Sequence, residues 1–80
     1  MYYVYILSSL KNPQKNYVGY SMNLKKRLIY HNNGWVKSTT LFKPWKIVWQ
    51  AGFEEKQKAM AFEKYLKSGS GSAFRNKRLV

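Results

Sequence analysis

The stretch YVYILSSLKNPQKNYVGYS, residues 3–21, decides the fold because it holds two short strand patterns on either side of one turn. Residues 2–7, YYVYIL, are aromatic and β-branched, and both alternating faces are apolar, which is typical of a strand covered on both sides. Residues 8–15 contain the turn formers Ser, Asn and Pro. The chain returns in NYVGYS, residues 16–21, so we expect a hairpin whose first strand lies inside a sheet.

A helix is predicted directly after the hairpin. Leu24 and Leu28 lie four residues apart and would share the buried side of a helix over residues 22–33. Ser21 is placed to cap its first turn, and Gly34 is placed to end it.

A third strand and a second helix follow. Residues 35–44 read as a loop, and the alternation in WKIVWQAGF, residues 45–53, predicts the third strand. Apolar residues then recur at spacings of three and four, which predicts a helix from Glu54 to Lys67. Glu54 and Glu55 would lie at its positive end.

The C-terminal segment is predicted to be a break followed by a short helical turn. SGSGS, residues 68–72, should break the second helix, although its backbone amides could instead cradle a phosphate. AFRNKRLV, residues 73–80, reads as a short helical turn that packs Phe74 and Leu79 onto the sheet. We therefore expect one α+β domain over residues 1–80.

Composition narrows the function classes. Cysteine is absent, which excludes disulfides, cysteine-ligated zinc, iron–sulfur clusters and thiol nucleophiles. No apolar run approaches the length of about 20 residues that crosses a membrane, and the N-terminal stretch has no charged region ahead of its hydrophobic residues. We expect a cytoplasmic protein with no membrane partner.

The charge balance points to a polyanionic partner. Fifteen Lys and Arg stand against three acidic residues, which gives a formal net charge of +12. The first acidic residue is Glu54, so the N-terminal two thirds of the chain carry positive charge alone. No basic amphipathic helix with an aromatic membrane face stands out. Nucleic acid is favoured over an anionic membrane surface because phosphate neutralisation is the commonest use of such a balance.

Five polar side chains could meet near one end of the sheet. Tyr5 and Tyr17 can share a face of the hairpin, and the first helix follows with Arg27 and His31 on one of its faces. Glu63, on the second helix, could lean over the same face. A carboxylate, an arginine and tyrosine or histidine hydrogen-bonding groups are the residue types that phosphodiester hydrolysis requires.

Each of these residues also has an ordinary structural explanation. Glu63 precedes Lys67 by four residues, the favourable order for a surface ion pair. Arg27 could be one more solvated cation, and His31 could interact with the carbonyl end of its helix. The tyrosines could simply bury aromatic area in the core.

Several motifs in this order resemble the GIY-YIG nuclease superfamily, in particular its small stand-alone members of UPF0213 type. The motifs are YVYIL, YVGYS, the R-x-x-x-H of NLKKRLIYHNNG, KPWKIVW and FEKYLKSGSG, with eleven residues between Tyr5 and Tyr17. The resemblance covers nearly the whole chain. It implies a three-stranded antiparallel sheet flanked by helices and a divalent-metal-dependent DNA endonuclease acting in repair or recombination. One departure is Tyr3, which stands where the first signature usually begins with glycine.

Residue by residue, the resemblance assigns the catalytic set. Tyr5 and Tyr17 match the signature tyrosines, Arg27 and His31 match the helix arginine and histidine, and Glu63 matches the glutamate that binds Mg²⁺ or Mn²⁺. Arg27 would hold phosphoryl oxygens. Tyr17 is favoured as general base, with His31 or Tyr5 positioning the water, and the net positive charge should lower the pKa values of tyrosine and histidine alike.

Phosphate contacts are expected outside the catalytic set. The residues assigned to nucleic-acid binding are Lys25, Lys26, Lys37, Lys43, Arg75, Asn76, Lys77 and Arg78. Of these, Asn76 lies where several related nucleases carry a phosphate-contacting asparagine. Substrate choice would come from DNA structure or from a partner protein, because a domain of this size offers little surface for reading sequence.

Two alternatives to the nuclease stay open. The first is a non-catalytic nucleic-acid-binding module that keeps the fold and the charge. The second is an RNA- or ribosome-associated protein that stacks bases on exposed Trp35 or Tyr30.

Overall fold

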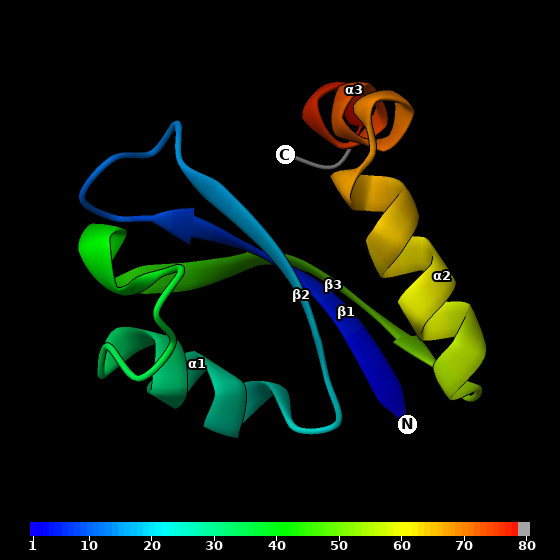
Figure 1. Cartoon of the computed structure of the whole chain (residues 1–80), viewed down its shortest axis with the longest axis horizontal. Coiled ribbons are helices and arrows are strands. Elements are labelled where there is room, and N and C mark those ends of the chain that lie inside the picture. The colour runs from blue at the N-terminus through cyan, green and yellow to red at the C-terminus, as the bar shows by residue number, and fades with distance from the viewer. Residues whose placement is uncertain (79–80) are drawn as a thin grey trace.

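The computed structural model describes residues 1–78 as a three-stranded sheet with helices packed against it (Figure 1). In chain order the elements are β1 (Tyr2–Ser9), β2 (Asn16–Ser21), α1 (Leu24–Asn32), the 3₁₀ helix η1 (Thr40–Phe42), β3 (Trp45–Phe53), α2 (Lys56–Lys67) and α3 (Gly69–Arg78). In Figure 1, α1 and α2 lie on opposite sides of the sheet, and α3 follows at the end of α2. The predicted α+β class is confirmed.

The sheet is antiparallel and has the strand order β2-β1-β3, so β1 is its central strand. Tyr5 of β1 pairs with Gly19 of β2 on one edge and with Gln50 of β3 on the other. Pairing on both edges and helices on both faces explain why YYVYIL is apolar at nearly every position. The predicted hairpin and third strand are confirmed.

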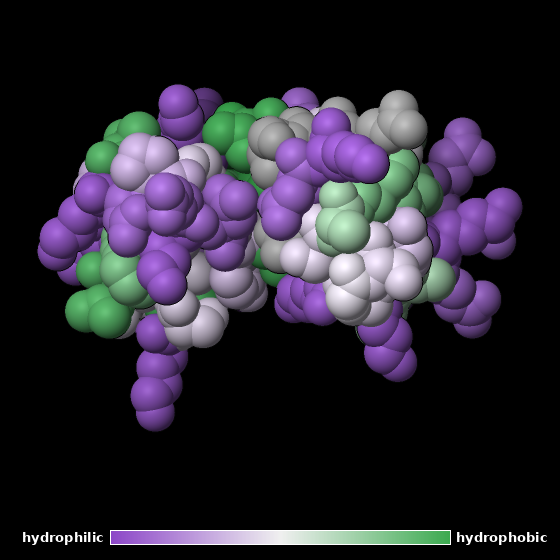
Figure 2. Space-filling view, turned by 90° about the horizontal axis from the view of Figure 1, so that it is seen from above, coloured by the Kyte–Doolittle hydropathy of each residue, from purple (hydrophilic) through white to green (hydrophobic). Residues whose placement is uncertain are grey.

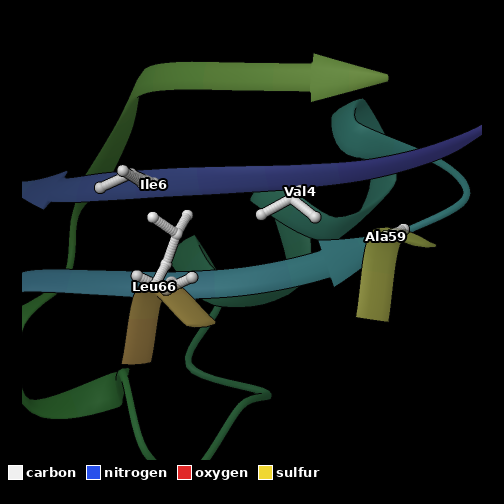
Figure 3. Close-up of a cluster of buried hydrophobic side chains, with 5 residues drawn as sticks. Val4, Ile6, Ala59 and Leu66 are labelled. Carbon is white, nitrogen blue, oxygen red and sulfur yellow. The ribbon is translucent and has the colours of Figure 1, made fainter. Parts of the chain in front are cut away.

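Because successive strand side chains point to opposite faces, β1 contributes to two separate cores. The cluster between the sheet and α2 consists of Val4, Ile6, Val18, Ala59 and Leu66 (Figure 3). The cluster between the sheet and α1 consists of Tyr5, Leu7 and Trp45, with Leu24 and Leu28 among the partly buried side chains against it. The second cluster includes one of the candidate catalytic tyrosines.

Helix α1 is shorter than the predicted residues 22–33. Its N-cap is Asn23 and not Ser21, because the Asn23 side-chain oxygen accepts a hydrogen bond from the Lys26 backbone N–H at 3.0 Å. Ser21 orders the preceding turn instead, since its hydroxyl oxygen accepts a hydrogen bond from the Asn23 backbone N–H. Gly34, with φ of 76°, follows the last turn as predicted.

Helix α2 ends at Lys67 as predicted, but it begins at Lys56 rather than Glu54. Glu55 precedes the first turn in an extended conformation and pairs with Lys58 at 3.0 Å. The late start follows from β3, which continues to Phe53 and leaves two residues to turn the chain.

After α2 the sequence predicts a break over SGSGS and then a short helical turn within residues 73–80. The helical turn is confirmed as part of a longer helix, but the break is confined to Ser68. Residues 69–78 form helix α3, so most of SGSGS is helical and not a loop. Ser68 makes this possible, because its side-chain oxygen accepts a hydrogen bond from the Gly71 backbone N–H at 3.1 Å and caps the new helix.

The contacts of α3 also differ from the prediction. The ring of Phe74 lies 6.0 Å from the ring of Tyr65, so Phe74 packs against α2 and not against the sheet. Leu79, which was expected to pack there too, lies outside the described residues.

The junction between α2 and α3 depends on the absence of a side chain at Gly71. A Cβ at Gly71 would lie 1.6 Å from the Tyr65 carbonyl oxygen and 2.7 Å from the Leu66 Cα, and neither backbone atom can move freely. We expect Gly71→Ala to lower the free energy of unfolding by about 1–3 kcal/mol, the usual cost of overpacking. Urea unfolding measures this, with Gly69→Ala as the control because a Cβ there meets nothing within 4 Å. Equal stability of the two variants would contradict this packing.

Candidate active site

The hairpin register places both signature tyrosines on the α1 side of the sheet. Tyr5 pairs with Gly19, and Tyr17 lies two residues before Gly19, so their side chains emerge from the same face. Tyr5 is only 1% exposed, and its ring lies across Gly19, where a Cβ would come within 2.4 Å of the ring and hydroxyl. Tyr17 is partly exposed at the edge strand β2.

His31 of α1 contacts both tyrosines and is completely buried. Its Nε2 lies 2.9 Å from the Tyr5 hydroxyl, and its ring centroid lies 5.0 Å from that of Tyr17. On its other side, Nδ1 lies 2.7 Å from the hydroxyl of Thr39.

The hydrogen bonds around His31 form a chain with one consistent direction. The Thr39 hydroxyl donates to the Val36 carbonyl, so it accepts from Nδ1–H of His31. Nε2 of His31 is then unprotonated and accepts from the Tyr5 hydroxyl. Both nitrogens of the neutral imidazole are occupied, and Tyr5 is held as a donor.

Burial sets the pKa values of this pair. Burial, followed by the charge of Arg27, lowers the pKa of His31 to about 4, so the imidazole is neutral near pH 7. Burial raises the pKa of Tyr5 to about 12; the Arg27 side chain opposes this rise, and Tyr17 and Glu63 add to it. The expectation that positive charge lowers both pKa values is therefore wrong for Tyr5, because desolvation of the phenolate outweighs the attraction of the cations.

The lowered pKa of His31 predicts acid sensitivity of the fold. In the unfolded chain His31 takes up a proton near pH 6.5, whereas in the folded protein it does so near pH 4. Its contribution to stability is therefore complete above pH 6.5 and is lost as the pH falls from 6.5 to 4. The full loss is about 3 kcal/mol.

Urea unfolding between pH 7 and pH 4 measures this loss. The control is His31→Phe, which keeps all the carboxylates and removes the imidazole. We expect the variant to lose less stability than the wild-type protein over the same range. Parallel pH profiles for the two proteins would show that His31 is not held neutral by the fold.

Thr39 is a site residue that the sequence did not reveal. It is fully buried and holds His31 through its hydroxyl, while its carbonyl accepts a hydrogen bond from the Trp45 indole N–H at 2.8 Å. The side chain of Asn32 also ties the end of α1 to the Trp45 backbone. A loop threonine carries no sequence signal of this kind, since its partner lies eight residues away on a helix.

Arg27 of α1 and Glu63 of α2 lie near enough to Tyr5 to affect its pKa. Arg27 is partly buried and affects the pKa values of both Tyr5 and His31. The Glu63 side chain is 22% exposed and pairs with Lys67 at 3.2 Å. The Lys67 ammonium in turn lies 5.5 Å from the centroid of the Tyr17 ring. The structure thus brings Tyr5 and Tyr17 into contact with His31 and places Arg27 and Glu63 near enough to act on Tyr5. The ion pair considered as an alternative for Glu63 also forms, and its lysine lies over Tyr17.

A single carboxylate is the acidic component of this site. Among residues 1–78, no three His, Cys, Asp or Glu side chains gather into a metal-binding group. Mg²⁺ fits such a site when water and substrate phosphate provide its remaining ligands, since this ion keeps several waters. Glu63 is partly exposed, as this mode of binding requires, and Lys67 balances its charge.

The residues predicted to contact phosphates lie on two sides of the molecule. Lys25, Lys26, Lys37 and Lys43 are exposed on α1 and the loop after it, and Asn76 and Lys77 are exposed on α3. Asn76 lines a groove of about 590 Å³ together with Ser8, Asn16 and Lys46. The side chains of Arg75 and Arg78 lie outside the described residues. Long hydrophilic side chains project into solvent at both ends of the view in Figure 2.

None of the described helices has both the length and the apolar character needed to cross a bilayer.

Comparison with known proteins gives consistent matches. The profile of the GIY-YIG catalytic domain matches residues 1–78. A UPF0213 protein of Clostridium perfringens is 41% identical over 68 residues, covering 84% of this chain and 71% of that protein. UPF0213 proteins of Streptococcus pneumoniae and Staphylococcus saprophyticus are 35% and 34% identical, covering 81% and 86% of this chain and 65% and 83% of those proteins.

Proposed function

Because this chain belongs to the GIY-YIG family, we propose that it is a DNA endonuclease that hydrolyses phosphodiester bonds with a divalent metal ion, Mg²⁺ or Mn²⁺. One observation carries the proposal. Tyr5, Tyr17 and His31 meet in a single hydrogen-bonded and aromatic cluster, with Arg27 and Glu63 at its edge. A purely structural arrangement has no need to gather a carboxylate and a guanidinium at two tyrosines.

The geometry separates the roles of the two tyrosines in this proposal. Tyr5 is buried, its hydroxyl donates to His31, and its pKa is raised to about 12, so it is unsuited to accept a proton. Tyr17 is partly exposed and is the tyrosine that a water molecule can reach. In the proposed reaction Tyr17 first loses its hydroxyl proton to solvent, and its phenolate oxygen then accepts a proton from the attacking water. The departing oxygen takes up a proton from solvent, and the Tyr5–His31 pair holds the site rigid.

The two charged residues act on the phosphate. Arg27 donates to the phosphoryl oxygens, and its charge stabilises the negative charge that grows on them during attack. Glu63 would hold the metal ion, which supplies Lewis-acid stabilisation and activates water when it is bound. Lys67 competes with the metal for Glu63 in the free protein, so metal affinity in this proposal depends on substrate.

The biological context of the proposed activity is DNA repair or recombination, with substrate choice set by DNA structure or by a partner protein. The expected substrates are branched or otherwise deformed DNAs, because five side chains around one phosphate read geometry and not sequence. The runner-up is a binding module that retains the fold, and both functions predict binding that weakens steeply with added salt.

Metal dependence distinguishes the two functions. Labelled duplex, flap and four-way-junction DNAs are incubated with the wild-type protein and Mg²⁺ or Mn²⁺, and parallel reactions contain EDTA. We expect strand cleavage of at least one branched DNA that EDTA abolishes. Salt-sensitive binding of every DNA with no cleavage under any metal condition would favour the binding module.

A further inference from the structure

A pair of aromatic rings, one exposed and one partly buried, lies beside the candidate active site, and the proposed reaction makes no use of it. Trp35 is 67% exposed, a large fraction for a residue type that is highly buried on average. Its ring centroid lies 5.2 Å from that of Tyr30, with the ring planes tilted by 58°. We refer to these two rings as the aromatic platform.

The end of α1 holds the platform rigidly. The Trp35 backbone N–H donates to the Tyr30 carbonyl at 3.0 Å, and the Gly34 N–H donates to the His31 carbonyl at 3.2 Å. With Gly34 at positive φ, these bonds form a Schellman motif, which turns the chain back over the last turn of the helix. Trp35 is therefore presented in a fixed position.

A Schellman motif often includes an apolar contact of this kind, so the contact alone could be explained as a helix cap. That explanation requires only a small apolar side chain. About two thirds of the Trp35 side chain stays exposed to water, so the contact buries little apolar area for so large a side chain. The exposed ring surface is what remains to be explained.

Positive charge surrounds the platform. The Lys26 ammonium lies 5.7 Å from the centroid of the Tyr30 ring, and Lys37 follows Trp35 by two residues and is exposed. The Lys43 side chain reaches Gly34 from the other end of the loop. Flat apolar surface interleaved with cations fits a ligand that has flat rings and negative charge, and unpaired nucleotides have both.

The platform is also close to the reacting groups. Tyr30 follows Arg27 by three residues on α1, and residues at this spacing are neighbours on a helix surface. A strand whose phosphate contacts Arg27 could therefore place a nearby base on Tyr30 or Trp35.

We propose that the aromatic platform stacks an unpaired base of single-stranded DNA next to the phosphate held at Arg27. This inference rests on the proposed function and narrows its substrate to DNA with a single-stranded stretch, such as a flap or an open junction. A fully paired duplex cannot use the platform, because its bases stack on each other.

The test compares the affinities of wild-type, Trp35→Ala, Trp35→Phe and Leu41→Ala proteins for a single-stranded oligonucleotide and a duplex of equal length. Fluorescence anisotropy at one salt concentration measures both affinities. Leu41 is the matched control because it is an apolar side chain in the same connection between α1 and β3, on η1, and is 71% exposed. We expect Trp35→Ala to weaken single-strand binding by about 5- to 100-fold, the usual contribution of one stacked base.

Duplex affinity should change by less than about twofold, Trp35→Phe should retain most of the single-strand affinity, and Leu41→Ala should behave as wild type. Equal weakening on both DNAs, or no weakening, would overturn the inference. Selective binding of a single-stranded RNA of the same sequence would overturn the assignment of the aromatic platform to DNA. If sedimentation shows that self-association depends on Trp35 and accounts for the loss of affinity, the platform instead contacts a second copy of the protein.

Cleavage separates this inference from the proposed function. If wild-type protein cuts branched DNA but Trp35→Ala binds single strands normally, the platform inference fails and the nuclease stands. If no DNA is cut but Trp35→Ala selectively loses single-strand binding, the platform inference is supported for a binding module and the proposed nuclease activity is contradicted.

Discussion

Replacing Glu63 by glutamine is expected to slow DNA cleavage by about 10³-fold or more, because the variant loses the carboxylate proposed to hold the metal and with it the stabilisation of phosphoryl charge. Glutamine keeps the size of the side chain. DNA affinity should not fall, since the variant removes a negative charge from a protein that binds a polyanion. Single-turnover cleavage at saturating protein measures the rate, and anisotropy measures the affinity.

Glu55→Gln provides the matched control for this change. Glu55 is close to Glu63 in the sequence and pairs with Lys58 on the exposed surface. Its replacement by glutamine removes the same unit of negative charge. We expect this variant to cleave at close to the wild-type rate. Loss of cleavage in both variants would indicate an effect of net charge, and retention in both would remove Glu63 from the reaction.

The second large effect is expected at Gly19, a residue with no functional group. An alanine Cβ there would lie 2.4 Å from the Tyr5 hydroxyl and ring, so the ring has to move away from His31. Displacement of catalytic groups by about 1 Å commonly costs about 10²-fold in rate. We therefore expect Gly19→Ala to cleave about 10²-fold more slowly than wild type, although the variant still folds and binds DNA.

The histidine reports directly on this displacement. His31 is the single histidine in the chain, so its imidazole ¹⁵N signals can be read without ambiguity. In Gly19→Ala the Nε2 signal should shift as it loses the Tyr5 hydrogen bond. Gly52→Ala is the control on β3, because a Cβ there meets mainly the flexible side chain of Met1. Unchanged signals together with a full cleavage rate in Gly19→Ala would show that the Tyr5 position is not required.

The strands were predictable because their patterns are local. YYVYIL and NYVGYS flank a turn with Asn and Pro, and the alternation of WKIVWQAGF gives β3 its observed bounds. The helix starts were harder, since Ser21 and Asn23 are equally good caps by type. Only the tertiary structure determines which of them faces the free N–H groups of α1.

The first turn of α3, residues 69–72, was missed because GSGS has a low helix propensity. Tertiary packing overrides that preference, since Gly71 allows the chain to approach the Tyr65 carbonyl and Ser68 caps the first turn. Small residues that look like a linker in sequence are here what allows two helices to meet closely.

The candidate site was predictable in its composition but not in its internal order. The sequence treats Tyr5 and Tyr17 alike, and only the structure distinguishes a buried hydroxyl bound to His31 from a ring at the sheet edge. Burial also reverses the effect that net charge was expected to have on the pKa of Tyr5. Thr39 could not be found at all, because its role depends on a loop returning to α1.

The most direct test of the central claim is to measure where the metal binds. The electron paramagnetic resonance signal of free Mn²⁺ is followed during titration into wild-type protein, Glu63→Gln and Glu55→Gln, each alone and with a saturating branched DNA. We expect weak Mn²⁺ binding by the free protein. With DNA present, we expect one additional bound ion per wild-type or Glu55→Gln protein and no additional ion for Glu63→Gln. The same tight Mn²⁺ binding in the Glu63→Gln complex as in the wild-type complex would contradict a metal site at Glu63.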